Sequence, residues 1–90
     1  MKRDDYLVCY DIANSKRLNK LARYLEKRTI RIQYSIFVAK NFTKEQIYQI
    51  AQDIVDIIDP DEDDVRIYRI IDNRLAMGSA YDLDDVFLFV

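Results

Sequence analysis

Five apolar residues, Tyr6-Leu7-Val8-Cys9-Tyr10, stand directly before Asp11 near the start of this 90-residue chain. A short run that is apolar at every position is typical of a central β-strand whose two faces are both covered. An ionised carboxylate at the end of such a strand loses water unless a cation or hydrogen-bond donors replace it. We therefore expect Asp11 either to have a structural partner, as a helix cap or in a salt bridge to an arginine, or to bind a metal ion.

The composition excludes several kinds of catalytic site. The chain has no histidine and one glycine, so it cannot form a Ser-His-Asp triad, a histidine-pair ribonuclease site, a histidine metal cluster or a glycine-rich phosphate loop. Hydrolysis of a phosphodiester would require carboxylates that hold Mg²⁺ or Mn²⁺, with water as the nucleophile. One cysteine excludes an intrachain disulfide, and the N-terminus resembles neither a signal peptide nor a membrane span. We expect a cytoplasmic protein that does not contact a membrane.

Charge is distributed unevenly along the chain, although the net charge is only −2. Residues 1–40 contain ten Lys and Arg against four Asp and Glu, whereas residues 41–90 contain four against twelve, which gives +6 and −8. Phosphate binding depends on a local basic surface and not on the net charge. The first part of the chain is therefore the candidate for contact with nucleic acid.

A basic amphipathic helix is predicted after the first strand, capped by Asn14 or Ser15. Its apolar residues fall at positions i, i+3, i+4 and i+7, namely Leu18, Leu21, Ala22 and Leu25. The other positions hold basic residues with only Glu26 opposing them: Lys16, Arg17, Lys20, Arg23, Lys27 and Arg28. This surface is either an ordinary solvated helix face or a phosphate-binding face.

Further strands and a second helix follow. Residues 29–40 alternate apolar and polar side chains, which predicts one long strand or two short strands joined by a bend near Gln33 to Ser35. Thr43 and Gln46 form a capping box at the start of the second helix, and Asp59-Pro60 ends it. We expect the isoleucines of this helix in the core. Its apolar residues follow at helical spacing: Ile47, Ile50, Ala51, Ile54, Val55 and Ile58. Residues 65–71 then form another strand.

This order of elements predicts an α+β protein with a ferredoxin-like βαββαβ sandwich, in which two helices cover one face of an antiparallel sheet. Residues 1–71 would form this domain. The other face of the sheet would be open, either to stack bases or to meet another subunit. Four aromatic residues are candidates for the open face: Tyr10, Tyr34, Phe37 and Tyr68.

Residues 72–90 contain the only glycine, Gly78, and end in five consecutive apolar residues, Val86 to Val90. We expect a linker followed by an added C-terminal strand, because an exposed apolar segment favours aggregation. This strand would pack on the edge of a sheet, preferentially that of the partner subunit in a homodimer.

A second group of carboxylates lies between residues 53 and 64: Asp53, Asp56, Asp59, Asp61, Glu62, Asp63 and Asp64. The group lacks the glycine and the spaced final glutamate of an EF-hand calcium loop. It is predicted to be an exposed helix end and turn, with a docking patch for a basic partner as the alternative.

Several segments together resemble the small CRISPR-associated endoribonuclease, the non-integrase subunit of the CRISPR adaptation complex. The resemblance covers residues 6–70 and is specific in the order and spacing of its parts. These are Tyr10-Asp11-Ile12, Lys16-Arg17, Lys20-Leu21-Ala22, Arg31-Ile32-Gln33-Tyr34-Ser35-Ile36-Phe37 and Asp63-Asp64-Val65-Arg66-Ile67-Tyr68. The resemblance implies a ferredoxin-like homodimer in which Asp11 is catalytic and binds Mg²⁺, or Mn²⁺, at the two-fold axis.

The same resemblance implies further site residues and partners. Arg17, Arg31, Lys16 and Lys20 would bind nucleic acid, and Tyr10 and Phe37 would shape the dimer cleft or stack a base. A CRISPR integrase and nucleic acid, RNA or DNA, are the implied partners. The two implied functions are a metal-dependent endonuclease and a non-catalytic subunit that holds DNA between integrase dimers during spacer integration. A ribonuclease toxin of similar fold is a third alternative.

Overall fold

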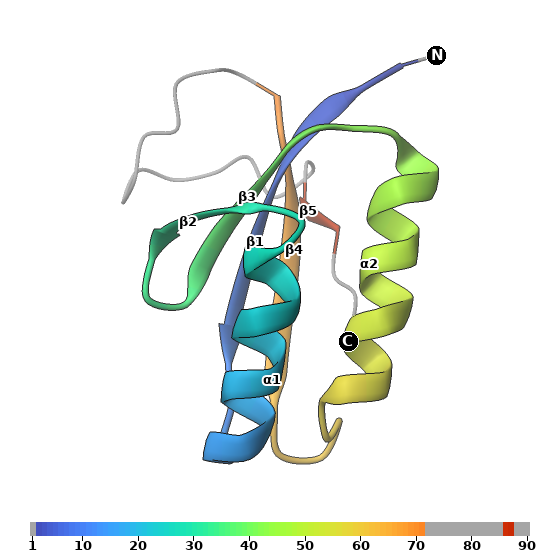
Figure 1. The fold of residues 1–90 in the computed structure, drawn as a ribbon. Coiled ribbons are helices and arrows are strands. Elements are labelled where there is room, and N and C mark those ends of the chain that lie inside the picture. The colour runs from blue at the N-terminus through green and yellow to red at the C-terminus, as the bar shows by residue number, and fades with distance from the viewer. Residues whose placement is uncertain (1, 72–85, 88–90) are drawn as a thin grey trace.

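The computed structural model describes residues 2–71 and 86–87, which form one antiparallel sheet with two helices on one face (Figure 1). The sheet has five strands in the order β2-β3-β1-β4-β5, so β1 is central. The predicted α+β sandwich with an additional strand is confirmed. In chain order the elements are β1 (Asp4–Asp11), α1 (Ser15–Glu26), β2 (Ile30–Gln33), β3 (Ile36–Phe42), α2 (Lys44–Ile57), β4 (Asp64–Ile70) and β5 (Val86–Phe87).

The hydrophobic core lies between the sheet and the helices. Tyr6, Val8 and Tyr10 alternate along β1 and point toward the helices, because successive side chains of a strand project to opposite faces. Buried residues of the other elements complete the cluster, among them Leu21, Leu25, Phe37, Ala39, Ile47, Ile50, Ile54, Val65 and Ile67. The expectation that the isoleucines of α2 are core residues is confirmed, whereas Val55 lies on the outer side of this helix and is 50% exposed.

Both helices begin at the predicted caps. The Asn14 side chain accepts a hydrogen bond from the Arg17 backbone amide at 3.0 Å, which makes Asn14 the N-cap of α1. At α2, the Thr43 hydroxyl accepts from the Gln46 amide at 3.2 Å and the Gln46 side chain accepts from the Thr43 amide at 2.8 Å. The capping box is thus complete, and α2 ends at Ile57, shortly before Pro60.

Residues 29–40 form two strands and not one. A turn at Tyr34 and Ser35 separates β2 from β3, within the region where the sequence allowed a bend. The Tyr10 amide donates to the Ser35 carbonyl at 3.2 Å. This bond holds the turn against the end of β1, next to Asp11.

Two of the four aromatic residues predicted for the open face of the sheet lie on its other face. Tyr10 and Phe37 were expected there, but both are buried under the helices, with ring centroids 6.0 Å apart. Alternation along β1 instead places Leu7, which is only 3% exposed, on the face away from the helices, with Val38 of β3 and Tyr68 of β4 as its cross-strand neighbours. Tyr68, which was also predicted for this face, is confirmed there, and Tyr34 lies in the turn between β2 and β3. The prediction for Tyr10 and Phe37 failed because an uninterrupted apolar strand does not indicate which alternate positions point toward the helices.

The C-terminal segment is described only at β5, which pairs antiparallel with β4 of the same chain. The linker predicted for residues 72–85 lies outside the described residues. The packing of the C-terminal strand on a partner subunit stays a prediction. Among the described residues, none of the helices combines the length and apolar character that a membrane span requires.

Candidate metal and nucleic-acid site

Asp11 is the last residue of β1, and its side chain is exposed. Directly opposite on β4 lies Asp64, its antiparallel cross-strand partner. Side chains of opposed residues project from the same face of a sheet, and two like charges in this arrangement repel each other. The Asp64 carboxylate is partly compensated by Arg66, whose Nε lies 3.0 Å from Oδ2. The end of the central strand pair therefore presents two carboxylates that a bound cation would stabilise.

The donor set at this position fits a hard divalent cation. Mg²⁺ prefers oxygen ligands and is usually held by one or two carboxylates together with water and phosphate oxygens. Asp11 and Asp64 supply two carboxylates, and residues 2–71 contain no group of three or more acidic or cysteine side chains arranged to hold a metal. Further ligands would have to come from water, from the nucleic acid or from a second subunit.

The loop that follows Asp11 is fixed by Asp63, whose side chain is completely buried. Asp63 Oδ1 accepts a hydrogen bond from the Ala13 amide at 2.9 Å, and Oδ2 accepts one from the Asp59 amide at 2.8 Å. Arg17 contributes two more donors, Nε to Oδ2 at 2.7 Å and Nη2 to Oδ1 at 3.1 Å. One carboxylate thus joins the β1–α1 loop, the first turn of α1 and the turn that precedes β4.

The hydrogen bonds to Asp63 stabilise its ionised form. Those from Arg17 are the main cause that holds the pKa of this carboxyl far below its usual range, with smaller contributions from the Asp59 and Ala13 amides. Burial opposes this effect, since it raises the pKa of a carboxyl group. Asp63 is therefore a charged structural anchor at neutral pH.

Asp63 corrects one interpretation of the sequence. The carboxylates between residues 53 and 64 were expected to form an exposed helix end and turn, but Asp63 is buried and Asp53 accepts a hydrogen bond from the Tyr24 hydroxyl. The sequence alone did not distinguish Asp63, which holds the loop after Asp11, from the six acidic residues near it. A useful signal was the position of Asp63 after Asp59-Pro60, where a turn leaves backbone amides in need of acceptors.

The structure divides the predicted nucleic-acid-binding residues into two kinds. Lys16 and Lys20 are exposed on α1. Arg17 is 24% exposed and is bound by Asp63 and by Glu62, whose Oε1 lies 3.0 Å from Nη2. Arg17 therefore has a structural role in holding the loop, and its contact with phosphate stays a prediction.

Arg31 stabilises the turn between β2 and β3. Its Nη2 and Nε donate to the Tyr34 carbonyl at 2.6 and 3.2 Å, and Nη1 bonds Glu26 of α1 at 3.1 Å. The guanidinium group also lies over the Phe37 ring. Arg31 and Tyr34, which is 70% exposed, border a hollow of about 350 Å³ beside α1. This hollow lies at the same end of the sheet as Asp11.

Burial argues against the prediction that Tyr10 and Phe37 stack a base, while their part in shaping a dimer cleft stays a prediction. Phe37 is fully buried, and the Tyr10 hydroxyl donates to the Tyr34 carbonyl at 3.4 Å from within the core. Burial also raises the pKa of Tyr10. Both residues support the turn, while Tyr34 is the aromatic side chain that solvent reaches.

The sequence matches the family model described as CRISPR associated protein Cas2 over residues 5–77. It is 41% identical over 64 residues to CRISPR-associated endoribonuclease Cas2 1 of Nitrosomonas europaea, covering 71% of this chain and 60% of the relative. It is 39% identical over 71 residues to CRISPR-associated endoribonuclease Cas2 2 of Thermodesulfovibrio yellowstonii, covering 79% and 77%. The match to the Nitrosomonas protein therefore spans less than two thirds of that protein.

Solved structures with the same architecture include Cas2 of Streptococcus pyogenes, with a TM-score of 0.70, 26% identity and coverage of 86% of this chain and 98% of that chain. A hypothetical protein of Thermus thermophilus gives a TM-score of 0.76 with 26% identity and coverage of 87% and 94%. A chain of a partial Cas6-RT-Cas1–Cas2 complex gives 0.67 with 29% identity and coverage of 91% and 86%.

Proposed function

Because this chain belongs to the Cas2 family of CRISPR-associated proteins, we propose that it acts in CRISPR adaptation as a metal-dependent endonuclease. The position of Asp11, exposed at the end of the central strand and opposite Asp64, carries this proposal. The names of its relatives as endoribonucleases support nuclease activity. RNA is the first substrate to test, with single-stranded and duplex DNA as alternatives.

In this proposal, some residues of the site bind the metal ion and others contact the nucleic acid. Asp11, with Asp64 and with Asp11 of a second subunit across a two-fold axis, would hold Mg²⁺ or Mn²⁺. A divalent ion held there supplies a more acidic water and neutralises charge on the phosphate. Lys16 and Lys20 on α1 would attract the phosphate backbone, and Tyr34 is placed to stack against a base.

A second function is a subunit that holds DNA without cutting it. One observation favours it: a similar chain occurs in a solved complex named for Cas1 and Cas2. The net charge of +6 on residues 1–40 is compatible with either function. Phosphate contacts along α1 serve both functions equally, so the basic surface does not distinguish them. Cleavage and integration therefore need separate assays.

Removal of divalent metal is the direct test of the nuclease proposal. Cleavage of single-stranded RNA in Mg²⁺ is expected to fall to background in excess EDTA and to return when Mg²⁺ or Mn²⁺ is restored, because the carboxylates do not activate water without the ion. The thermal unfolding midpoint, measured under both conditions, checks that the fold persists. Cleavage that continues unchanged in EDTA would overturn the metal-dependent mechanism.

The proposed homodimer is tested by deleting residues 83–90. The sheet face away from the helices carries Leu7, Val38 and Tyr68, and β5 pairs with β4 beside it. If the C-terminal strand packs on the partner, the deletion is expected to weaken dimerisation at least tenfold in sedimentation equilibrium, which corresponds to about 1.4 kcal/mol. A lower unfolding midpoint with unchanged dimerisation would instead assign the strand to its own subunit.

A further inference from the structure

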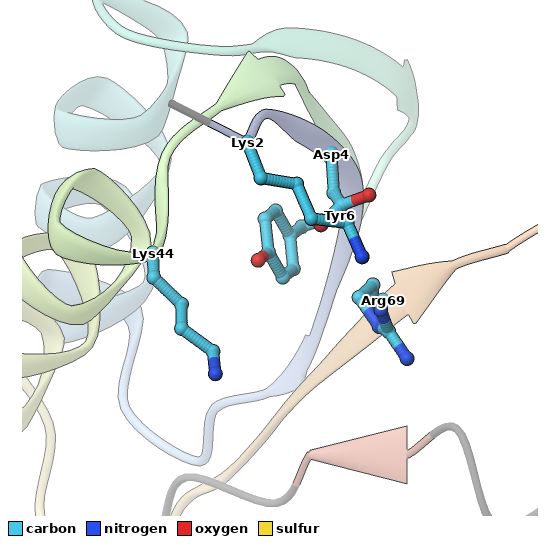
Figure 2. A pocket seen from close by; sticks show the side chains of 5 residues that line it. All are labelled: Lys2, Asp4, Tyr6, Lys44 and Arg69. Atoms are coloured by element: carbon cyan, nitrogen blue, oxygen red, sulfur yellow. The ribbon is translucent and has the colours of Figure 1, made fainter.

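A second polar site lies at the end of the sheet away from Asp11. It is a cavity of about 310 Å³ lined by Lys2, Asp4, Tyr6, Lys44 and Arg69 (Figure 2). Lys2 precedes β1, and the other residues come from the start of β1, the first position of α2 and the end of β4. Tyr6 and Arg69 are cross-strand partners, so their side chains share one face of the sheet. Three cations face one carboxylate, which leaves the lining with a charge of +2.

The Tyr6 hydroxyl is the informative group in this cavity. Tyr6 is only 2% exposed as a whole residue, and its side chain lines the cavity. Burial raises the pKa of Tyr6, so the phenol stays protonated and keeps a proton to donate. The cavity therefore offers a neutral hydroxyl donor beside its cations.

The cationic side chains around Tyr6 favour an anionic ligand in this cavity. Figure 2 shows the Tyr6 ring among the side chains of Lys2, Lys44 and Arg69. Lys44 is also the first residue of α2, where the helix dipole adds partial positive charge. A lysine ammonium group provides donors in several directions, and an arginine provides a planar fork that matches oxygen anions. Several donors around one small cavity suit a compact anion with several acceptor oxygens.

We propose that this cavity binds a phosphate group. A phosphate offers acceptor oxygens to the Tyr6 hydroxyl and to the cations together, and its charge is complementary to the +2 lining. The source is either the backbone of a nucleic acid or a free phosphate, and both present the same oxygens. As a backbone contact the cavity would extend the proposed function to a second position on the strand; phosphate binding itself does not depend on cleavage at Asp11.

Titration with inorganic phosphate at constant ionic strength, followed by NMR of the backbone amides, is the first test. Amide shifts are expected to change around Tyr6, Thr43 and Lys44. Lys44→Gln removes one exposed cation and Tyr6→Phe removes only the hydroxyl, and each is expected to weaken phosphate binding about tenfold. Lys40→Gln, which removes an exposed cation outside the cavity, is the matched control. Absence of shifts near the cavity, or equal weakening by the control, would overturn the proposal.

A second titration with short single-stranded DNA identifies the source of the phosphate. Weaker DNA binding by Lys44→Gln and Tyr6→Phe, but not by Lys40→Gln, would assign the cavity to the nucleic-acid backbone. Unchanged DNA binding together with weaker binding of inorganic phosphate would assign it to a free phosphate. Neither titration requires cleavage, so a failure of the nuclease proposal leaves both results interpretable.

Discussion

Replacing Asp11 with asparagine is expected to lower metal-dependent cleavage by at least about 100-fold. Asp11 is exposed and none of the hydrogen bonds described for residues 2–71 uses its side chain, so the change leaves the fold intact. Loss of a residue that only supports a metal ligand already costs roughly 10- to 100-fold in metal affinity or activity. Loss of a direct ligand, shared between two subunits, should cost more. Initial rates of RNA cleavage over a range of Mg²⁺ concentrations measure the effect.

The matched control is Asp56→Asn, which makes the same replacement of one carboxylate oxygen by an NH2 group at an exposed residue of α2. It is expected to cleave at the wild-type rate. Binding of Mn²⁺, followed by electron paramagnetic resonance, should weaken in Asp11→Asn and not in the control. Wild-type cleavage by a folded Asp11→Asn protein would exclude Asp11 from the catalytic site.

The same substitution separates the two proposed functions. A subunit that holds DNA needs the basic surface of α1 and its contact with the integrase, but not the carboxylate of Asp11. Integrase-dependent insertion of a spacer is therefore expected to survive in Asp11→Asn if the protein acts as a scaffold. Loss of insertion by a folded variant would argue against a purely structural role and would link the carboxylate to adaptation.

The sequence predicted the elements of the fold because its local signals agree with one another. The Asn14 cap, the capping box of Thr43 and Gln46, and the period of the α2 isoleucines each have a short-range cause that the tertiary structure preserves. The apolar strand before Asp11 correctly predicted a central position for β1. These features depend on neighbouring residues alone, which a single sequence contains.

The environment of individual side chains was harder to predict. Tyr10 and Phe37 were placed on the wrong face because their strands carry apolar residues on both faces. Arg17 and Arg31 were predicted as phosphate ligands, but residues far from Arg17 in sequence and a nearby backbone carbonyl at Arg31 accept most of their hydrogen bonds. The pairing of Arg17 with Asp63 spans 46 positions. Contacts between residues so far apart in sequence depend on how the strands pair in the sheet. Patterns of neighbouring residues do not specify this pairing.

Asp63→Asn is expected to destabilise the fold by about 3 kcal/mol, at the lower end of the cost of breaking a buried ion pair. The variant keeps the size of the side chain but removes the charge that accepts four hydrogen bonds. The total stability of a chain of this length is only about 5–13 kcal/mol. Chemical denaturation at pH 7 measures the loss, and Asp61→Asn, an exposed change in the same turn, should stay within about 0.5 kcal/mol of wild type.

The pH dependence of stability distinguishes loss of this charge from a simple packing defect. The pKa of Asp63 is lowered in the folded protein, chiefly by Arg17, relative to about 3.9 in the unfolded chain. Its contribution is therefore complete above about pH 5 and disappears as the pH falls below about 4 toward the folded-state pKa, because the unfolded chain then binds the proton first. The stability difference between wild type and Asp63→Asn should shrink across this acidic range. A difference that stays constant down to pH 2 would show that Asp63 acts through packing and not through its charge. Since Asp63 also holds the amide of Ala13, two residues after Asp11, a charge-dependent loss would directly couple the stability of this turn to the position of the candidate metal ligand.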